Sequence, residues 1–207
     1  MGFMRRPGRT SPVAPAVTGL AVAAALAAAG LWTDDRPAAG LPAGQPGTVG
    51  AAAGAKVMAP GIRPDAPALA GADLDGRRVA LGDFRGQVVV LNAWGSRCAP
   101  CRAEADDLER LSRQTRADGV RFLGINTRDP DRAAARSFVR AHGLTFPSFH
   151  DPDGDLLLRF PPSLVDPHAI PSVLVIDRRG RVAAALGGAV TDEQLRPLLT
   201  RLLAEEP

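Results

Sequence analysis

The 207-residue chain has few residues of the kinds that bind metals, and almost no lysine. It contains two cysteines and three histidines, and Lys56 is its single lysine. A tetrahedral zinc site needs four ligands, usually with two of them closely spaced along the chain. His142, His150 and His168 lie far along the chain from the cysteines, and none is spaced from another like a paired ligand. We therefore expect no metal and no bound cofactor.

A concentrated positive charge is also missing. The formal net charge of +3 and the pI of about 9.6 are typical of nucleic-acid binding. However, Arg5, Arg6 and Arg9 are the only charged side chains in the first 33 residues, and without them the net charge is zero. The remaining arginines are interspersed with Asp and Glu, so they form no basic stripe. The sequence therefore argues against a nucleic-acid partner.

Residues 1–33 predict a signal peptide or a membrane anchor. The basic start precedes an uncharged stretch, from Val13 to Trp32, that is dominated by Ala, Val and Leu. About twenty helical residues span about 30 Å, which is enough to cross a bilayer. Ala27-Ala28-Ala29 has the small residues of a cleavage site, so a cleaved signal and a retained anchor are both compatible with the sequence.

Residues 34–64 are rich in Pro, Gly and Ala and have little periodicity, which predicts a flexible linker. No internal repeat is present. We expect one folded domain over residues 65–205, which is long enough to bury a core.

Strand and helix patterns alternate through this domain. In chain order they are extended pieces at 68–74 and 77–81, a strand at 87–93, a helix at 99–116, a strand at 120–126, a helix that ends at Gly143, a hairpin at 172–177 and 181–186, and a helix at 191–204. Asp129-Pro130 predicts the N-cap and first residue of the second helix, and Thr191 and Gln194 have the spacing of a capping box. This order predicts an α/β fold with a mixed sheet covered on both faces.

The two cysteines form the sequence Cys98-Ala99-Pro100-Cys101, directly after a strand that is apolar on both faces. A thiolate at the start of the following helix would lie beside backbone N–H groups that lack intrahelical partners. Such a position lowers the pKa of a thiol from about 8.5 toward 7 or below, which makes it a usable nucleophile. The pattern favours redox exchange, with a structural disulfide and a pair of metal ligands as the alternatives.

The segment from 91 to 104, LNAWGSRCAPCRAE, resembles the active-site signature of thioredoxin-like thiol–disulfide oxidoreductases. More narrowly, it resembles their exported TlpA/ResA branch. Three further stretches agree, namely DLDG at 73–76 with FRG at 84–86, DPDG at 151–154, and Ile170-Pro171 before the hairpin. The resemblance implies a thioredoxin-like fold, with a central mixed sheet flanked by helices, and an exported enzyme that exchanges disulfides with protein cysteines.

The resemblance also implies roles for individual residues. Cys98 would be the exposed nucleophile and Cys101 the buried resolving thiol of a redox-active disulfide. Pro171 would be cis and lie beside the cysteines, which leaves the backbone of Ile170 free to pair with an incoming peptide. Glu104 lies about one helical turn beyond Cys101 and would handle protons, the alternative being a solvated helix glutamate.

Three positions near the motif add to this picture. Asn92 stands where cytoplasmic thioredoxins carry a buried aspartate. Arg97 replaces the tryptophan that usually precedes the first cysteine, so it would favour the thiolate and remove an aromatic contact surface. Trp94 matches a packing residue of the family, and we group it with Arg97 and Ile170 as the expected substrate-binding residues.

The expected partners are protein thiols and disulfides, with apocytochrome c as one candidate, and an upstream electron donor or acceptor in the membrane. The expected location is extracytoplasmic, either secreted or anchored to the outer face of the cell membrane, where disulfides persist. Three alternatives remain: a copper-handling protein or a peroxide-reducing enzyme on the same fold, and a non-enzymatic module with a structural disulfide.

Overall fold

The computed structural model describes residues 54–206. The signal or anchor predicted over residues 1–33 lies outside these residues, as does the linker from 34 to 53. The core is a six-stranded sheet with the spatial order β1 (Ala55–Val57), β8 (Val182–Gly187), β7 (Ser172–Ile176), β4 (Val88–Trp94), β5 (Val120–Thr127) and β6 (Ser148–Asp151).

The rest of the described chain adds helices and a small hairpin. The helices are α1 (Ala99–Thr115), α2 (Arg132–Ala141) and α3 (Asp192–Ala204), and the hairpin consists of β2 (Ala70–Ala72) and β3 (Arg78–Ala80). Short 3-10 turns occur at η1 (Pro60–Ile62), η2 (Leu81–Phe84) and η3 (Leu157–Arg159). No helix within residues 54–206 has the length and apolar character needed to span a bilayer.

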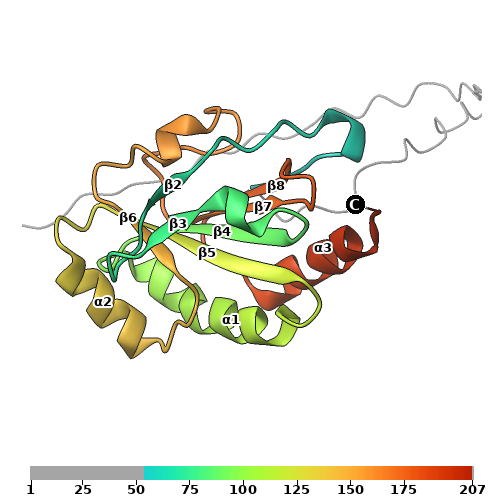
Figure 1. The fold of residues 1–207 in the computed structure, drawn as a ribbon. Coiled ribbons are helices and arrows are strands. Elements are labelled where there is room, and N and C mark those ends of the chain that lie inside the picture. The colour runs from blue at the N-terminus through green and yellow to red at the C-terminus, as the bar shows by residue number, and fades with distance from the viewer. Residues whose placement is uncertain (1–53, 207) are drawn as a thin grey trace, which may run out of the picture. The chain divides into compact units, whose positions relative to one another are not determined.

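Strand β4 lies inside the sheet and leads into the cysteine motif. It pairs in parallel with β5 and antiparallel with β7, so the sheet is mixed, as predicted (Figure 1). All seven residues of β4 are buried, which explains why its sequence is apolar on both faces. The predicted α/β architecture with a mixed sheet is confirmed.

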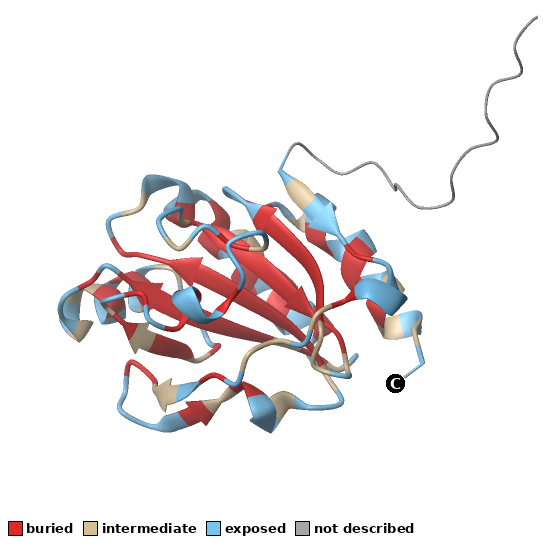
Figure 2. Ribbon diagram, turned by 90° about the horizontal axis from the view of Figure 1, so that it is seen from above, coloured by how far each residue is buried: buried red, intermediate tan, exposed pale blue. Residues whose placement is uncertain are grey.

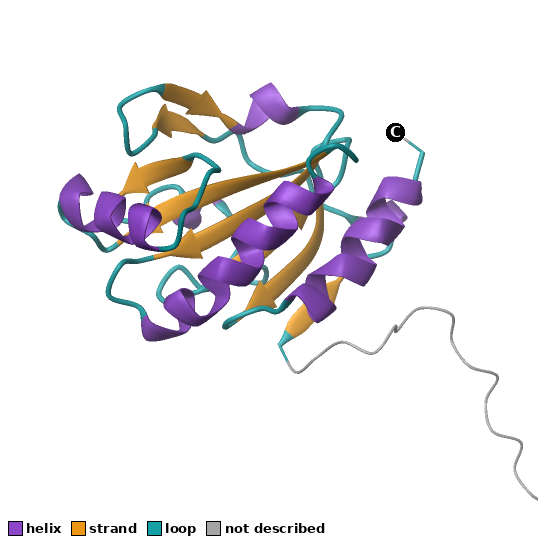
Figure 3. Ribbon diagram, turned by 90° about the horizontal axis from the view of Figure 1, so that it is seen from below, coloured by secondary structure: helices purple, strands orange, loops and turns teal. Residues whose placement is uncertain are grey.

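The two faces of the sheet are covered differently. The three helices lie on one face and the β2–β3 hairpin lies on the other (Figures 1 and 3). On the helix side, leucines of α1 and α3 pack against valines of β4 and β7. On the other side, a second core joins the sheet to the hairpin and to residues 156–165. The central strands are therefore buried from both sides (Figure 2).

The folded part begins earlier than predicted. Residues 55–57, which we placed in the linker, form β1 and pair with Ala184–Leu186 of β8. Met58 and Arg63, which follow this strand in the chain, are buried. Strand β6 was not predicted at all.

The start of α2 also differs from the prediction. Asp131, not Asp129, is its N-cap, and the Asp131 carboxylate accepts hydrogen bonds from the backbone N–H groups of Ala133 and Ala134. Asp129 is buried, and its carboxylate contacts the cysteine loop instead. The capping box of α3 is confirmed by a 2.9 Å hydrogen bond from the Thr191 N–H to the Gln194 side chain.

Candidate active site

The cysteines lie where β4 passes into α1. Cys98 is the N-cap of α1, and its sulfur accepts a 3.1 Å hydrogen bond from the N–H of Cys101. The two sulfurs form a disulfide. Cys98 is half-buried, whereas Cys101 is 2% exposed and packs into the core behind it. A partner molecule can therefore reach the first sulfur more easily than the second.

The loop before β7 lies beside this motif. The Ile170–Pro171 peptide bond is cis, as the resemblance implied. Ile170 and Cys98 both pack against the cluster that contains Trp94 and Cys101. Close approach is possible because residue 95 is glycine: an added Cβ would lie 3.1 Å from the Cδ1 of Ile170. The fold thus brings together residues that are about 70 positions apart in the sequence.

Glu104 is a buried acid on the inner side of α1. It is 2% exposed, so it is not the solvated helix glutamate that was the alternative. Its carboxylate accepts hydrogen bonds from the Asn92 side chain at 2.8 Å and from the Val190 N–H at 2.9 Å. Burial raises the pKa of Glu104 to about 7, and the two hydrogen bonds offset this only in part. The group can therefore gain or lose a proton near neutral pH.

The expected substrate-binding residues differ in exposure. Arg97 is exposed next to Cys98 and Ile170 is half-buried, and their role in substrate binding stays a prediction. Trp94 is 1% exposed, stacks on Phe138 with ring centroids 4.5 Å apart, and donates to the Ser148 hydroxyl. Its assignment to substrate binding is wrong, because no face of the ring is open to a substrate. Trp94 is a buried residue that packs in the same cluster as Cys101.

Sequence reasoning missed a polar network under the cysteine loop. Asp129 accepts hydrogen bonds from the N–H and the hydroxyl of Ser96 and from the side chain of Asn126. Asn126 also lies within 3.4 Å of the His150 ring. One signal was available, since polar residues that follow neighbouring parallel strands meet at the same edge of a sheet.

The proline-rich segment 160–168 ends beside the cis-proline loop. Arg128 donates a hydrogen bond to the His168 carbonyl. The His168 residue is exposed. Among residues 54–206, no three His, Cys, Asp or Glu side chains lie close enough together to hold a metal ion.

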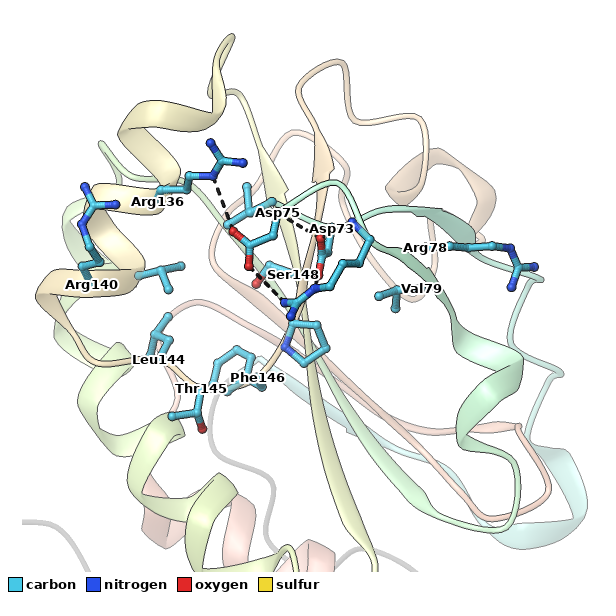
Figure 4. A pocket seen from close by; sticks show the side chains of 14 residues that line it. Asp73, Asp75, Arg78, Val79, Arg136, Arg140, Leu144, Thr145, Phe146 and Ser148 are labelled. Carbon is cyan, nitrogen blue, oxygen red and sulfur yellow. Dashed lines mark hydrogen bonds and ion pairs between the residues drawn. The ribbon is translucent and has the colours of Figure 1, made fainter.

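A separate cleft of about 670 Å³ lies between the β2–β3 hairpin and α2 (Figure 4). Arg77 pairs there with Asp73 and Asp75, and Arg136 lies 3.6 Å from Asp75. The cleft is lined by neither cysteine and by neither Ile170 nor Pro171. It is therefore distinct from the cysteine site.

Comparisons with known proteins identify the family of the chain. Residues 62–185 match the AhpC/TSA family. The chain belongs to the AhpC/TSA family. The thiol-disulfide oxidoreductase ResA of Bacillus thuringiensis subsp. konkukian is 31% identical to this family member over 141 residues, which cover 68% of this chain and 78% of the relative.

Two solved structures are also similar to this AhpC/TSA family member. A DsbF homologue from Corynebacterium diphtheriae has a TM-score of 0.64 and 34% identity, covering 72% of this chain and 92% of that one. A secreted thiol-disulfide isomerase from Corynebacterium glutamicum has a TM-score of 0.65 and 35% identity, covering 73% and 92%. The protein is therefore a thiol–disulfide oxidoreductase with a thioredoxin-like fold.

Proposed function

We propose that Cys98 and Cys101 are the redox-active pair of this enzyme and that Cys98 attacks the partner. The observation that carries the proposal is the position of Cys98 at the N-cap of α1, with Cys101 buried one turn behind it. In the reduced enzyme, the Cys98 thiolate would be stabilised by the positive end of the helix and by backbone N–H groups of the first turn.

The exchange then takes two steps. The Cys98 thiolate attacks one sulfur of a partner disulfide, the partner's S–S bond breaks, and its second sulfur leaves as a thiolate. Cys101 loses its proton and attacks the sulfur of Cys98, which releases the partner's first sulfur. The partner gains two electrons from the enzyme, one proton that came from Cys101 and one proton from the solvent, and Cys98 and Cys101 are oxidised to a disulfide. The same steps in reverse would oxidise a partner dithiol.

Glu104 is our candidate for the group that takes the proton from Cys101. It lies three residues further along α1, on the same side of the helix. A carboxyl with a pKa of about 7 is near the optimum for accepting and returning a proton at neutral pH. Asn92 and the Val190 N–H hold this carboxyl in place.

The backbone beside Pro171 is our candidate for the partner-binding surface. Within residues 54–206, the N–H and C=O groups of Ile170 make no hydrogen bond. An extended segment of the partner can pair with such groups as an added strand. Arg97, which is exposed and directly precedes Cys98, would contact the same segment.

We further propose that the enzyme acts outside the cytoplasm on protein thiols and disulfides. The basic and apolar pattern of residues 1–33 supports export, and the similar protein from Corynebacterium glutamicum is described as secreted. Retention of residues 1–33 would anchor the enzyme to the membrane. Cytochrome c maturation, with apocytochrome c as the partner and a membrane protein as the electron donor or acceptor, is the pathway that we propose.

Cysteine substitutions test the chemistry. The reduced enzyme should reduce insulin disulfides, Cys98→Ser should abolish this activity, and Cys101→Ser should accumulate a mixed disulfide with the substrate, since the second step is lost. Exchange activity that survives in Cys98→Ser would overturn the proposal. Peroxide turnover or tight copper binding by the reduced protein, in place of exchange, would favour the two other functions on this fold.

The equilibrium reduction potential, measured in a glutathione buffer, tests the direction of electron flow. A potential of about −270 mV would indicate a reductant, and a potential of about −120 mV would indicate an oxidant.

A further inference from the structure

A buried carboxylate contacts the turn that leads into Cys98. Asp129 follows β5 and is 2% exposed. Its Oδ2 accepts a hydrogen bond from the N–H of Ser96 at 2.9 Å, and its Oδ1 accepts one from the Ser96 hydroxyl at 2.7 Å. The Asn126 side chain donates a third, at 2.6 Å. Since a buried charge is costly unless it is hydrogen-bonded, these three donors are what keeps the carboxylate at this position.

The same serine is held from its other side. Nη2 of Arg102 donates to the carbonyl oxygen of Ser96 at 2.8 Å. The N–H of Cys98 donates to the carbonyl of Gly95 at 3.1 Å, which closes the turn. The N–H, the hydroxyl and the carbonyl of Ser96 therefore all have partners, and Cys98, the N-cap of α1, follows two residues later.

We infer that Asp129 is a positioning residue for thiol–disulfide exchange: through Ser96, it fixes the turn that places the Cys98 sulfur at the first-turn N–H groups of α1. The inference rests on the proposed role of Cys98. The effect of a helix end on a charge falls off within one turn, so a small displacement of Cys98 weakens the stabilisation of its thiolate. The hydrogen bonds from Ser96 to Asp129, which follows the neighbouring strand β5, prevent that displacement.

Two neutral substitutions separate position from charge. Asp129→Asn can keep the hydrogen bonds, because its amide oxygen can accept from Ser96 and Asn126 while its NH₂ donates to the Ser96 hydroxyl. Asp129→Ala removes them. The first readout is the pH dependence of Cys98 alkylation in the reduced full-length protein, and the second is kcat/KM for insulin reduction. We expect Asp129→Ala to have a higher Cys98 pKa than Asp129→Asn and a kcat/KM roughly tenfold lower.

Glu109 provides a matched control. It is 6% exposed and, like Asp129, accepts three hydrogen bonds, two from Thr145 and one from Arg113, but it lies eleven residues beyond Cys98 on α1. Glu109→Ala should lower the thermal midpoint while leaving the Cys98 pKa and kcat/KM unchanged. If Asp129→Ala and Asp129→Asn share one Cys98 pKa and one kcat/KM, Asp129 is merely structural and the inference is overturned.

Ser96→Ala keeps the test decisive if Asp129→Ala does not fold. It removes only the 2.7 Å hydroxyl bond, so it should raise the Cys98 pKa by a smaller amount in the same direction. A wild-type Cys98 pKa in Ser96→Ala would then overturn the inference. Because alkylation is measured without turnover, the positioning role can fail while Cys98→Ser still confirms the exchange chemistry.

Discussion

Glu104 shows how burial changes the behaviour of a single side chain. Its pKa is raised to about 7 by burial, whereas in the unfolded chain it titrates near 4.5. Between these values the folded state binds more protons than the unfolded state, so the free energy of unfolding falls as the pH rises. The loss is complete above about pH 7 and amounts to about 3 kcal/mol, since each unit of pKa shift corresponds to about 1.4 kcal/mol.

We therefore expect Glu104→Gln to remove this slope. Urea unfolding of the oxidised protein, in which the cysteines do not titrate, should give wild-type stabilities that decrease from pH 5 to pH 8. The Glu104→Gln curve should be flatter over the same range, while the exposed Glu193→Gln should follow the wild type. Parallel curves for wild type and Glu104→Gln would show that this carboxyl does not titrate where its burial indicates.

Local motifs predicted the site only in part. The Cys98–Cys101 pair and the cis bond at Pro171 belong to a recognisable sequence signature, and Glu104 follows from helical spacing. Asp129 was missed because an Asp-Pro pair matches the local rule for a helix start, and its true partner, Ser96, lies 33 residues earlier in the chain. Contacts of this kind depend on which strands become neighbours, which no local rule contains.

At the scale of elements, β5 passes very close to its neighbours at Gly124. This glycine lies opposite Asn92 of β4 and Ser148 of β6. A Cβ added here would lie 2.7 Å from the indole nitrogen of Trp94 and would collide with the Ser148 hydroxyl. Real Cβ atoms do not approach so closely, so the side chains of Ser148 and Trp94 would have to move. The space that glycine leaves is filled by the Trp94–Ser148 hydrogen bond.

We expect Gly124→Ala to destabilise the protein by about 2–3 kcal/mol, as overpacking of a close-packed core does. Gly82→Ala is the control, because nothing lies within 4 Å of a Cβ at that position, and it should unfold at the wild-type urea concentration. Adding Ser148→Gly to Gly124→Ala should recover part of the loss. A wild-type stability for Gly124→Ala would mean that β5 and β6 are further apart than described.

Long elements with a strong pattern were predictable, whereas short ones were not. The apolar run of β4, the helix α1 and the capping box of α3 are visible in the sequence within a few residues of their true bounds. Strands β1 and β6 have three and four residues, too few to show a period. β1 also lies in a Gly- and Ala-rich stretch, and it forms a strand only because the edge of β8 is available for pairing.

At the scale of the whole domain, one arginine joins both ends of the described chain. Arg63 is 7% exposed and donates to Asp177, in the β7–β8 turn, at 3.1 Å. It also forms a two-pronged pair with Glu205, at 2.5 and 2.7 Å, just after α3. Asp177 follows Ile176, which pairs with Val89 near the start of β4, so this cluster lies at the opposite end of the sheet from the cysteines. This cluster therefore contributes to the stability of the domain and takes no part in disulfide exchange.

We expect Arg63→Met to lower the free energy of unfolding by about 3 kcal/mol at pH 7, because it leaves Glu205 without its ion-pair partner and the buried Asp177 with Arg181 alone. Arg110→Met, which breaks only the surface pairs of this arginine with Asp107 and Asp192, should cost less than about 1 kcal/mol. Neither change should alter kcat/KM for exchange at temperatures where the protein is folded. An unchanged urea midpoint in Arg63→Met would show that the two ends are held by other contacts.

The loss of unfolding free energy in Arg63→Met should depend on pH with a definite sign. Burial raises the pKa of Asp177, but hydrogen bonds from Arg181 and Arg63 outweigh it, so the pKa lies below the ordinary 3.8. The hydrogen bond from Arg63 lowers the pKa of Glu205 below its ordinary 4.5. A carboxylate whose pKa is lowered by folding stabilises the folded state at pH values above its ordinary pKa. This stabilisation is lost as the pH falls through the lowered pKa. The difference in unfolding free energy between wild type and Arg63→Met should therefore be constant from pH 6 to 8 and shrink below about pH 4. A difference that stays constant into acid would mean that Arg63 acts through packing of its aliphatic stem and not through its charge.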